Sequence, residues 1–281
     1  MIRRAVPGDA DFVASLLVHG DVEPFLSARR PRDRDAVLER IERSHTEPPR
    51  FGVFVIEETG RPAGVMEFEE GNRRSRIAHL GGLALHPEFR GRHLAEAAAR
   101  EFQRHLLLDL GYHRLQLEIY GFNERGMRHA ERSGFVREGV KRRAYRRHGE
   151  WVDGVTYALL REDLGLPARV DALYEYIARH NEGVRSGDWE PLGECLAEDA
   201  TLEFEGVPVG PFRGRDAIVA AYRAQPPDDE VRIVEAVDGD PVVADYVWSR
   251  ESGEPGGTLR ATFVGASIAA LVVSVARRSV T

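Results

Sequence analysis

One segment, residues 80–111, constrains the fold of this chain more than any other. It reads as an apolar strand that ends at His86-Pro87, a turn with the sequence Glu-Phe-Arg-Gly-Arg-His, and a helix that runs to Leu110. The first turn of a helix leaves backbone N–H groups without intrahelical partners, and the helix dipole favours negative charge there. The order strand, basic turn, helix therefore predicts a binding site for a phosphate group. The nucleotide P-loop pattern Gly-x-x-x-x-Gly-Lys-Ser/Thr is absent from the sequence.

Strands and helices alternate through residues 1–163, which is typical of an α/β domain. A helix is expected after the turn at 7–11, and a hairpin is expected across Gly60-Arg61-Pro62. The expected strands are 2–5, 51–57, 63–69, 76–85, 115–120 and 151–160. Further helices are expected over 34–44 and 123–132.

The rest of the chain shows helices first and strands afterwards, without β-α-β alternation. The expected helices are 170–185, 189–197 and 215–224, and the expected strands are 201–205, 231–237, 242–249, 259–264 and 268–275. This order predicts an α+β cone or half-barrel. Leu164-Gly165-Leu166-Pro167 reads as a linker, so the predicted domains are 1–164 and 165–281.

Charge and cysteine content narrow the class of protein. The formal net charge is −7, and residues 166–281 hold 11 Arg against 20 Asp and Glu. A single cysteine allows no intramolecular disulfide, and the longest apolar run, 264–276, is too short to span a bilayer. We expect a cytoplasmic protein with no membrane partner. The basic stretch 141–147 allows contact with nucleic acid or acidic groups, but a solvated face is the simpler interpretation, and no nucleic-acid signature accompanies it.

Three motifs in order make residues 1–163 resemble the GNAT N-acetyltransferases. The turn within 83–95 is similar to the family pattern Arg/Gln-x-x-Gly-x-Gly/Ala. The second match is Leu-Gln-Leu-Glu-Ile-Tyr at 115–120 with Asn-Glu-Arg-Gly at 123–126. The third, Ser-Gly-Phe-Val-Arg-Glu-Gly at 133–139, resembles the branch of ribosomal-protein N-terminal acetyltransferases. The resemblance implies a mixed, splayed central sheet with helices on both faces. It also implies transfer of an acetyl group from acetyl-CoA to a primary amine, without a metal.

The resemblance implies which residues hold acetyl-CoA. A backbone edge at 83–85 would hydrogen-bond the pantetheine arm, and the amides of 92–95 would cradle the pyrophosphate, beside arginines that can bind phosphate through two hydrogen bonds. An asparagine after the next strand would contact the arm. The implied binding set is Leu83, Ala84, Leu85, Arg90, Gly91, Arg92, His93, Leu94, Ala95 and Asn123.

Two positions depart from the family pattern. His93 stands where glycine is usual, so its side chain would crowd the phosphates, require a positive φ, or itself reach the phosphate oxygens. Ala130 stands where the family has its acid, a tyrosine, so that role is vacant or has moved.

Three side chains are candidates for catalysis. Glu118 matches the strand glutamate that serves as base in the ribosomal-protein acetyltransferases, and the alternative is an ion pair with a neighbouring arginine. Tyr120 and Tyr145 are candidate acids, and the alternative for each is a packing role. Acetyl transfer can also proceed by positioning alone, with the proton leaving through solvent.

Residues 168–281 resemble the SnoaL-like, nuclear transport factor 2-like cone fold on Gly-Asp-Trp at 187–189 and the stretches 196–202 and 212–218. The base and oxyanion tyrosine of its ketosteroid-isomerase members fall on Phe204 and His180, so neither role is carried over. The resemblance implies a ligand-binding or dimerisation module, since the exposed strands of cone folds commonly pair in homodimers, but the residues themselves do not fix the oligomeric state. Two alternatives stay open: a non-catalytic acetyl-CoA-binding or sensing protein, and a second domain that acts as a separate isomerase-like or cyclase-like enzyme.

Overall fold

The computed structural model describes residues 1–26, 33–249 and 255–275. The chain divides into two compact units: Met1–Leu107 with Tyr112–Asp163, and Leu108–Gly111 with Leu164–Thr281. The main change of unit therefore falls between Asp163 and Leu164, one residue before the predicted boundary. Each unit is built on a sheet of its own. None of the helices in the described ranges is both long enough and apolar enough to cross a membrane.

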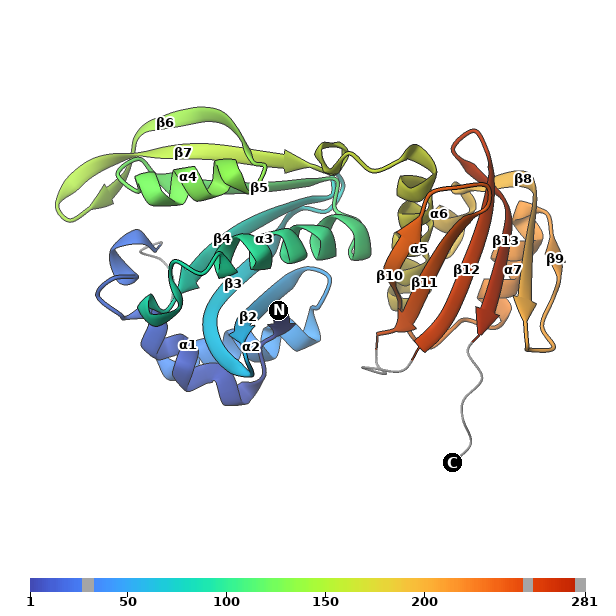
Figure 1. The fold of residues 1–281 in the computed structure, drawn as a ribbon, viewed down its shortest axis with the longest axis horizontal. Coiled ribbons are helices and arrows are strands. Elements are labelled where there is room, and N and C mark those ends of the chain that lie inside the picture. The colour runs from blue at the N-terminus through green and yellow to red at the C-terminus, as the bar shows by residue number, and fades with distance from the viewer. Residues whose placement is uncertain (27–32, 250–254, 276–281) are drawn as a thin grey trace. The chain divides into compact units, whose positions relative to one another are not determined.

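The first unit is a mixed seven-stranded sheet in the order β1-β2-β3-β4-β5-β7-β6. All neighbouring strands are antiparallel except β4 and β5, which run parallel. The strands are β1 (Ile2–Arg4), β2 (Phe51–Glu58), β3 (Arg61–Asn72), β4 (Ile77–Leu85), β5 (Arg114–Tyr120), β6 (Val136–Arg147) and β7 (Glu150–Leu160). The helices are α1 (Ala10–Leu17), α2 (Arg34–Thr46), α3 (Leu94–Arg104) and α4 (Glu124–Arg132). This arrangement confirms the predicted splayed α/β sheet (Figure 1).

The parallel strands β4 and β5 stay together only briefly. Their pairing covers Ile77, Ala78 and His79 of β4 and ends there, after which the two ribbons diverge (Figure 1). The register between β3 and β4 shifts just beyond this point, between Gly81 and Ala84, and Gly82 in this stretch has φ +66°. A glycine in the left-handed region is the usual centre of a bulge that bends a strand. The bend turns the rest of β4 away from β5.

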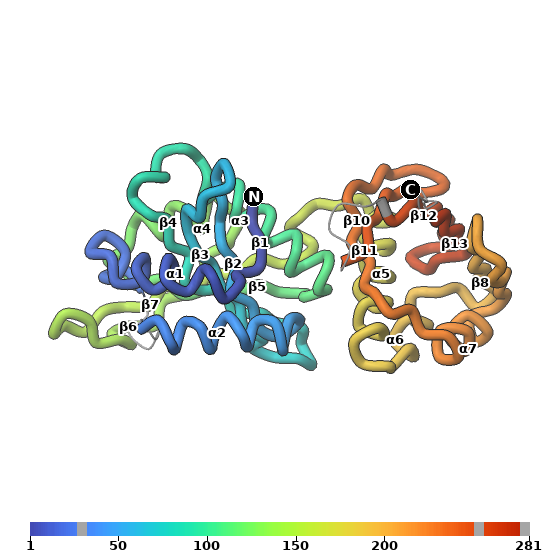
Figure 2. The backbone as a smooth tube through the Cα atoms, turned by 90° about the horizontal axis from the view of Figure 1, so that it is seen from below, coloured from blue at the N-terminus to red at the C-terminus, as the bar shows by residue number. Residues whose placement is uncertain are grey.

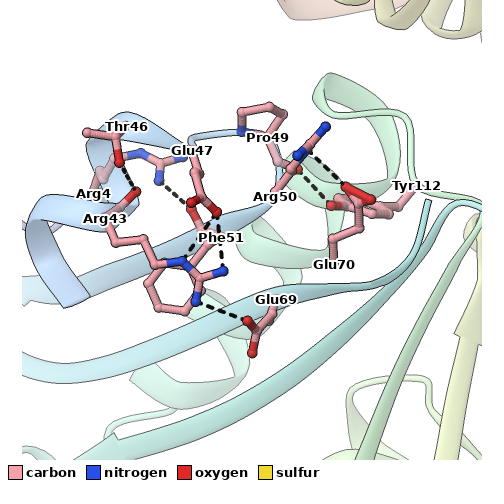
Figure 3. Close-up of polar contacts among 10 residues, drawn as sticks. All are labelled: Arg4, Arg43, Thr46, Glu47, Pro49, Arg50, Phe51, Glu69, Glu70 and Tyr112. Carbon is pink, nitrogen blue, oxygen red and sulfur yellow. Dashed lines mark hydrogen bonds and ion pairs between the residues drawn. The ribbon is translucent and has the colours of Figure 1, made fainter.

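Helices α1 and α2 pack against the first strands of this sheet. Apolar residues of both helices and of β2 form one buried cluster that includes Leu16, Val37 and Phe51. The end of α2 is tied to the sheet by Arg43, whose guanidinium lies over the Phe51 ring and donates to Glu69 at 3.0 Å (Figure 3). Strands β2 and β3 are therefore tied to the two helices, beside the strand β4 that bends.

Two elements of the first unit differ from the sequence expectation. Strand β6 was not predicted, because nearly all its side chains are exposed and the strand has no alternating apolar pattern. The helix expected to run to Leu110 ends as α-helix at Arg104 and continues as a π-helical turn over His105–Asp109.

The second unit is a six-stranded sheet in the order β10-β11-β12-β13-β8-β9, with helices on one side of its curve (Figure 2). The strands are β8 (Leu196–Glu205), β9 (Phe212–Arg213), β10 (Val231–Val237), β11 (Val242–Trp248), β12 (Pro255–Val264) and β13 (Ser267–Val275). The helices are α5 (Ala168–Ser186), α6 (Glu190–Gly193) and α7 (Arg215–Ala224). This is the expected cone-like half-barrel.

The prediction of a helix over 189–197 is wrong in the length of the helix. Only Glu190–Gly193 is helical, and Leu196 already belongs to β8, where it pairs with Ile268 of β13. Pro191 and Gly193 are poor helix residues, so a short segment that contains both gives way to strand pairing. The short strand β9 was not predicted either.

The interior of the second unit is filled by aromatic side chains around His180. Trp189 and Tyr222 stack with ring centroids 4.8 Å apart, and each meets the His180 ring edge-on. Nδ1 of His180 lies 3.2 Å from Asn181 Oδ1. Burial lowers the pKa of His180 to about 4, because the imidazolium form would lose its hydration there.

The buried imidazole makes the second unit sensitive to acid. The unfolded chain binds a proton near pH 6.5 and the folded chain only near pH 4, so stability rises with pH across this window and is lost as pH falls. We expect His180 to account for a loss of roughly 3 kcal/mol of unfolding free energy between pH 7 and pH 4. Urea unfolding followed by Trp189 fluorescence, compared with His180→Gln, measures it. An identical pH slope in the variant would contradict the assignment.

Candidate active site

The separation of β4 from β5 opens the first unit into two adjoining cavities of about 580 and 440 Å³. Residues that line both include Leu83 on β4 with Asn123 and His129 at α4, so the two spaces meet there. The larger cavity reaches along β5 to Glu118, and the smaller reaches the start of α3. A long molecule could therefore lie through the gap with one end in each space.

The smaller cavity gathers most of the residues expected to hold the coenzyme. Its lining includes nine of the ten: Leu83, Ala84, Leu85, Arg90, Gly91, His93, Leu94, Ala95 and Asn123. On one side, Ala84 and Leu85 pair with β3. Because β5 has left the sheet at this point, the opposite backbone edge of 83–85 faces the gap. This edge and the first turn of α3 present N–H donors to one space.

Positive charge lines the same cavity. Arg90 donates to the Asp21 carbonyl at 3.1 Å, and burial together with nearby Arg125 lowers its pKa. Arg125 and Arg132 on α4 also line the cavity, although the sequence analysis did not single them out. Arg132 and His93 both contact Glu96 and hold the pKa of that carboxyl below its usual range. Arginines beside free helix amides suit a bound diphosphate.

Arg92 differs from the other expected coenzyme residues. It is absent from the lining of both cavities, and its Nη1 lies 2.8 Å from Glu58 Oε2. Its guanidinium also lies 5.8 Å from the centre of the Phe89 ring. The carboxylate of Glu58 supplies the counter-charge that was expected from phosphate, so a phosphate contact for Arg92 stays a prediction.

His93 adopts the backbone conformation that the sequence analysis named as one possibility. It precedes α3 with φ +57° and ψ 11°, in the left-handed region. Its side chain is 85% exposed, and Nδ1 lies 3.3 Å from Glu96 Oε2. The missing glycine is therefore accommodated by backbone strain, with the imidazole bound to its own helix.

The junction of the two cavities is formed by the start and middle of α4. Asn123 caps this helix, since its Oδ1 accepts from the Gly126 N–H at 2.9 Å, and the side-chain NH₂ remains as a donor. Ala130 is buried in the lining of the larger cavity. Its neighbour His129 lines both cavities, and burial lowers its pKa, with Arg132 adding to the effect. Sequence reasoning missed His129 because it lies one position from the family's tyrosine.

The larger cavity holds Glu118 in contact with a lysine. Lys141 Nζ donates to Glu118 Oε2 at 2.6 Å, so the expected ion pair exists with lysine in place of arginine. Glu118 Oε1 is buried and has no hydrogen-bond partner among the described residues. Gly154 on β7 lies directly beneath it, and a Cβ at that position would overlap Oε1.

Further titratable groups flank this pair. His79 Nε2 lies 2.8 Å from Gln116 Nε2. Burial lowers the pKa of His79, and the positive charge of Lys141 lowers it further. The other two carboxylates that line the cavity each face an arginine: Glu67 meets Arg40 at 2.6 Å, and Glu138 pairs with Arg114. The lining of the cavity is otherwise largely apolar, and each of its three carboxylates contacts a cation.

Tyr120 and Tyr145 line neither cavity. The Tyr120 ring stacks on Phe122 at 5.5 Å, meets Tyr145 edge-on, and carries the Arg147 guanidinium on its face. These contacts are those of packed rings, and a catalytic role for either hydroxyl stays a prediction. A different hydroxyl, that of Tyr157, belongs to a residue lining the larger cavity and donates to Glu131 at 3.1 Å.

The comparison with known proteins agrees with this geometry. Residues 1–136 match the family model described as acetyltransferase (GNAT) domain, and residues 177–271 match the SnoaL-like domain. The first unit is a GNAT acetyltransferase domain. The protein is therefore an acyltransferase that combines a GNAT acetyltransferase domain with a SnoaL-like domain.

Individual relatives are distant. An uncharacterized N-acetyltransferase from the SPbeta prophage of Bacillus subtilis (strain 168) is 26% identical over 136 residues, which are 48% of this chain and 76% of the relative. The spermidine N-acetyltransferase of Vibrio cholerae, solved with CoA and spermine, superposes with a TM-score of 0.53 at 20% identity, covering 59% of this chain and 98% of that one. A ribosomal L7/L12 alpha-N-protein acetyltransferase solved with coenzyme A gives 0.52 at 16% identity, covering 57% and 92%. Likenesses this distant establish the shared fold.

The strain at His93 can be measured directly in this GNAT domain. His93→Gly and His93→Ala both remove the imidazole, but only alanine keeps a Cβ at φ +57°. We expect the glycine variant to be about 1 kcal/mol more stable than the alanine variant, because glycine accepts this conformation without a clash. Denaturant unfolding of the two variants under one condition gives the difference. An alanine variant of equal or greater stability would show that the site is unstrained.

Proposed function

We propose that this protein transfers the acetyl group of acetyl-CoA to a primary amine on a small molecule or a peptide N-terminus. The observation that carries the proposal is the gap between β4 and β5, which joins a cavity lined by helix amides and arginines to a larger one that holds Glu118 and Lys141. The coenzyme is a long anion with a thioester at one end. Its diphosphate fits the start of α3 beside Arg90 and Arg125, and its thioester end then reaches the junction at Asn123 and His129.

The acceptor amine belongs in the larger cavity, where Glu118 provides a carboxylate. Attack on a thioester requires a neutral amine, so a proton must first leave the ammonium. Glu118 Oε1 is buried and meets no hydrogen-bond partner in the part of the chain that the structure describes, and such an oxygen accepts a proton or a hydrogen bond readily. His129, neutral because burial lowers its pKa, lies at the junction where the thiolate would form, beside the alanine that replaces the family's acid. Solvent reaches the same place and can carry the remaining proton.

The second domain serves as a dimerisation or ligand-binding module. At the positions of the isomerase base and oxyanion tyrosine the chain has Phe204, in β8, and His180, which is packed between aromatic rings. Cross-strand partners Val237 and Val243 expose apolar side chains on β10 and β11, which supports dimerisation through this sheet.

Coenzyme binding depends on the charge at the start of α3. Ala95 lines the smaller cavity, whereas Ala97, two residues further on, is exposed and lines neither cavity. We expect Ala95→Glu to weaken acetyl-CoA binding by at least about tenfold in calorimetry, because its carboxylate repels the diphosphate. Ala97→Glu is the matched control and should bind like the wild type. Equal binding by both variants, or no binding by the wild type, would refute the proposed coenzyme site.

Catalysis depends on the position of the Glu118 carboxylate. Gly154→Ala pushes a methyl group into Glu118 Oε1, whereas the same change at Gly139 on the neighbouring strand meets only Thr156 Oγ1, at 3.5 Å. We expect Glu118→Gln to lower kcat by about a hundredfold and Gly154→Ala by at least about tenfold, with Gly139→Ala unchanged. The assay measures coenzyme thiol released in the presence of a panel of primary amines. Full activity in Glu118→Gln would remove this residue from the mechanism.

A further inference from the structure

The chain contains a single lysine, and the structure places it in the cavity assigned to the acceptor. Every other basic side chain that is cationic at neutral pH is an arginine, which is not an acetyl acceptor of this kind. Lys141 lies on β6 opposite Gly154 of β7, and its side chain is 56% exposed. A primary amine that belongs to the protein therefore already stands where an external amine would have to come.

The contact that Lys141 makes is the contact that an acceptor needs. Its Nζ is 2.6 Å from Glu118 Oε2, which is hydrogen-bond distance for direct proton transfer. The second oxygen of the same carboxylate is buried with no partner within the described part of the chain. Glu118 can thus bind the ammonium, take its proton, and hold the resulting amine in place.

We propose that the enzyme acetylates its own Lys141, in the same molecule, with acetyl-CoA as donor. The inference rests on the proposed function, because it uses the same coenzyme site and the same base. The geometry that supports it is the position of Nζ beside Glu118 in the larger cavity, which opens into the coenzyme cavity at Leu83 and Asn123.

The step balances without any further reactant. The Lys141 ammonium gives one proton to Glu118, and the neutral amine attacks the thioester carbonyl carbon. An N–C bond forms and the C–S bond breaks. Nitrogen loses two protons between ammonium and amide; one ends on the coenzyme thiol and the other passes from Glu118 to solvent.

The product would change the site. An amide carries no charge, so acetylation ends the ion pair with Glu118 and leaves an acetamide group in the acceptor cavity. Only one lysine per chain can react in this way, because there is no second lysine. An external amine would then enter a cavity that is partly filled by the acetamide group, and it would find the Glu118 carboxylate no longer paired with the Lys141 ammonium.

The chain provides an internal control for uncatalysed acetylation. When the chain is produced for the test so that it begins at Met1, its other primary amine is the α-amine of that residue, which is 77% exposed. At neutral pH an ordinary α-amine has a neutral fraction roughly a hundredfold larger than that of an ordinary lysine. Chemistry without catalysis therefore labels Met1 first, whereas the proposed reaction labels Lys141 first.

The test incubates the full chain with isotope-labelled acetyl-CoA and locates the label by peptide mass spectrometry. We expect Lys141 to be labelled at least about tenfold faster than Met1, at a rate independent of protein concentration, and Glu118→Gln to remove that preference. Arg146→Lys adds a second lysine on the same strand, outside the lining of both cavities, and its new amine should label no faster than Met1. Lys141→Arg should lose the label altogether.

Parallel measurement of coenzyme release with external amines separates the two proposals. Acetylation of external amines with Lys141 unlabelled, or with Lys141 and the amine added in Arg146→Lys labelled alike, overturns self-acetylation and leaves the proposed function intact. A rate that rises with protein concentration overturns the intramolecular step. If neither Lys141 nor any external amine is acetylated, both proposals fail together.

Discussion

The site depends on one feature of the first sheet, the short parallel pairing of β4 with β5. Three residues of β4 hold the two strands together, and the bulge at Gly82 then turns β4 away. This separation frees one backbone edge of 83–85 and opens the two cavities on either side of Leu83. Helices α1 and α2 pack against the first strands of the same sheet. A continuous sheet would hold its hydrogen bonds internally and would have no room for a coenzyme.

The two cavities differ in how their charge is arranged. The smaller one offers helix amides together with Arg90 and Arg125, which suits a strong anion. In the larger one, the carboxylates of Glu67, Glu118 and Glu138 each already contact a cation of the chain. An incoming amine therefore meets Glu118 with Lys141 already bound to one of its two oxygens, and Lys141, partly exposed beside the candidate base, is the cation best placed to be displaced or to react.

Much of the fold and of the candidate site was predictable from local sequence patterns. The features that were not predictable have physical causes. The basic turn and the start of α3 were predictable because glycine, arginine and helix-forming residues act locally. Strand β6 was missed because its side chains are exposed on both faces, so pairing with β7 alone defines it. The partner of Glu118 could not be read from the sequence, since Lys141 reaches it only through the register β5-β7-β6. Likewise, the ion pair of Arg92 with Glu58 could not be predicted, because Glu58 lies far from Arg92 in the sequence.

The proposed coenzyme site is the gap between β4 and β5, and amide hydrogen exchange can locate the bound coenzyme there. With saturating acetyl-CoA, we expect slower exchange at the amides of 83–85 and 92–96, with β1 and the second domain unchanged. If exchange in both of those segments stays the same while the coenzyme is bound, the coenzyme lies elsewhere on the chain and the proposed site is wrong.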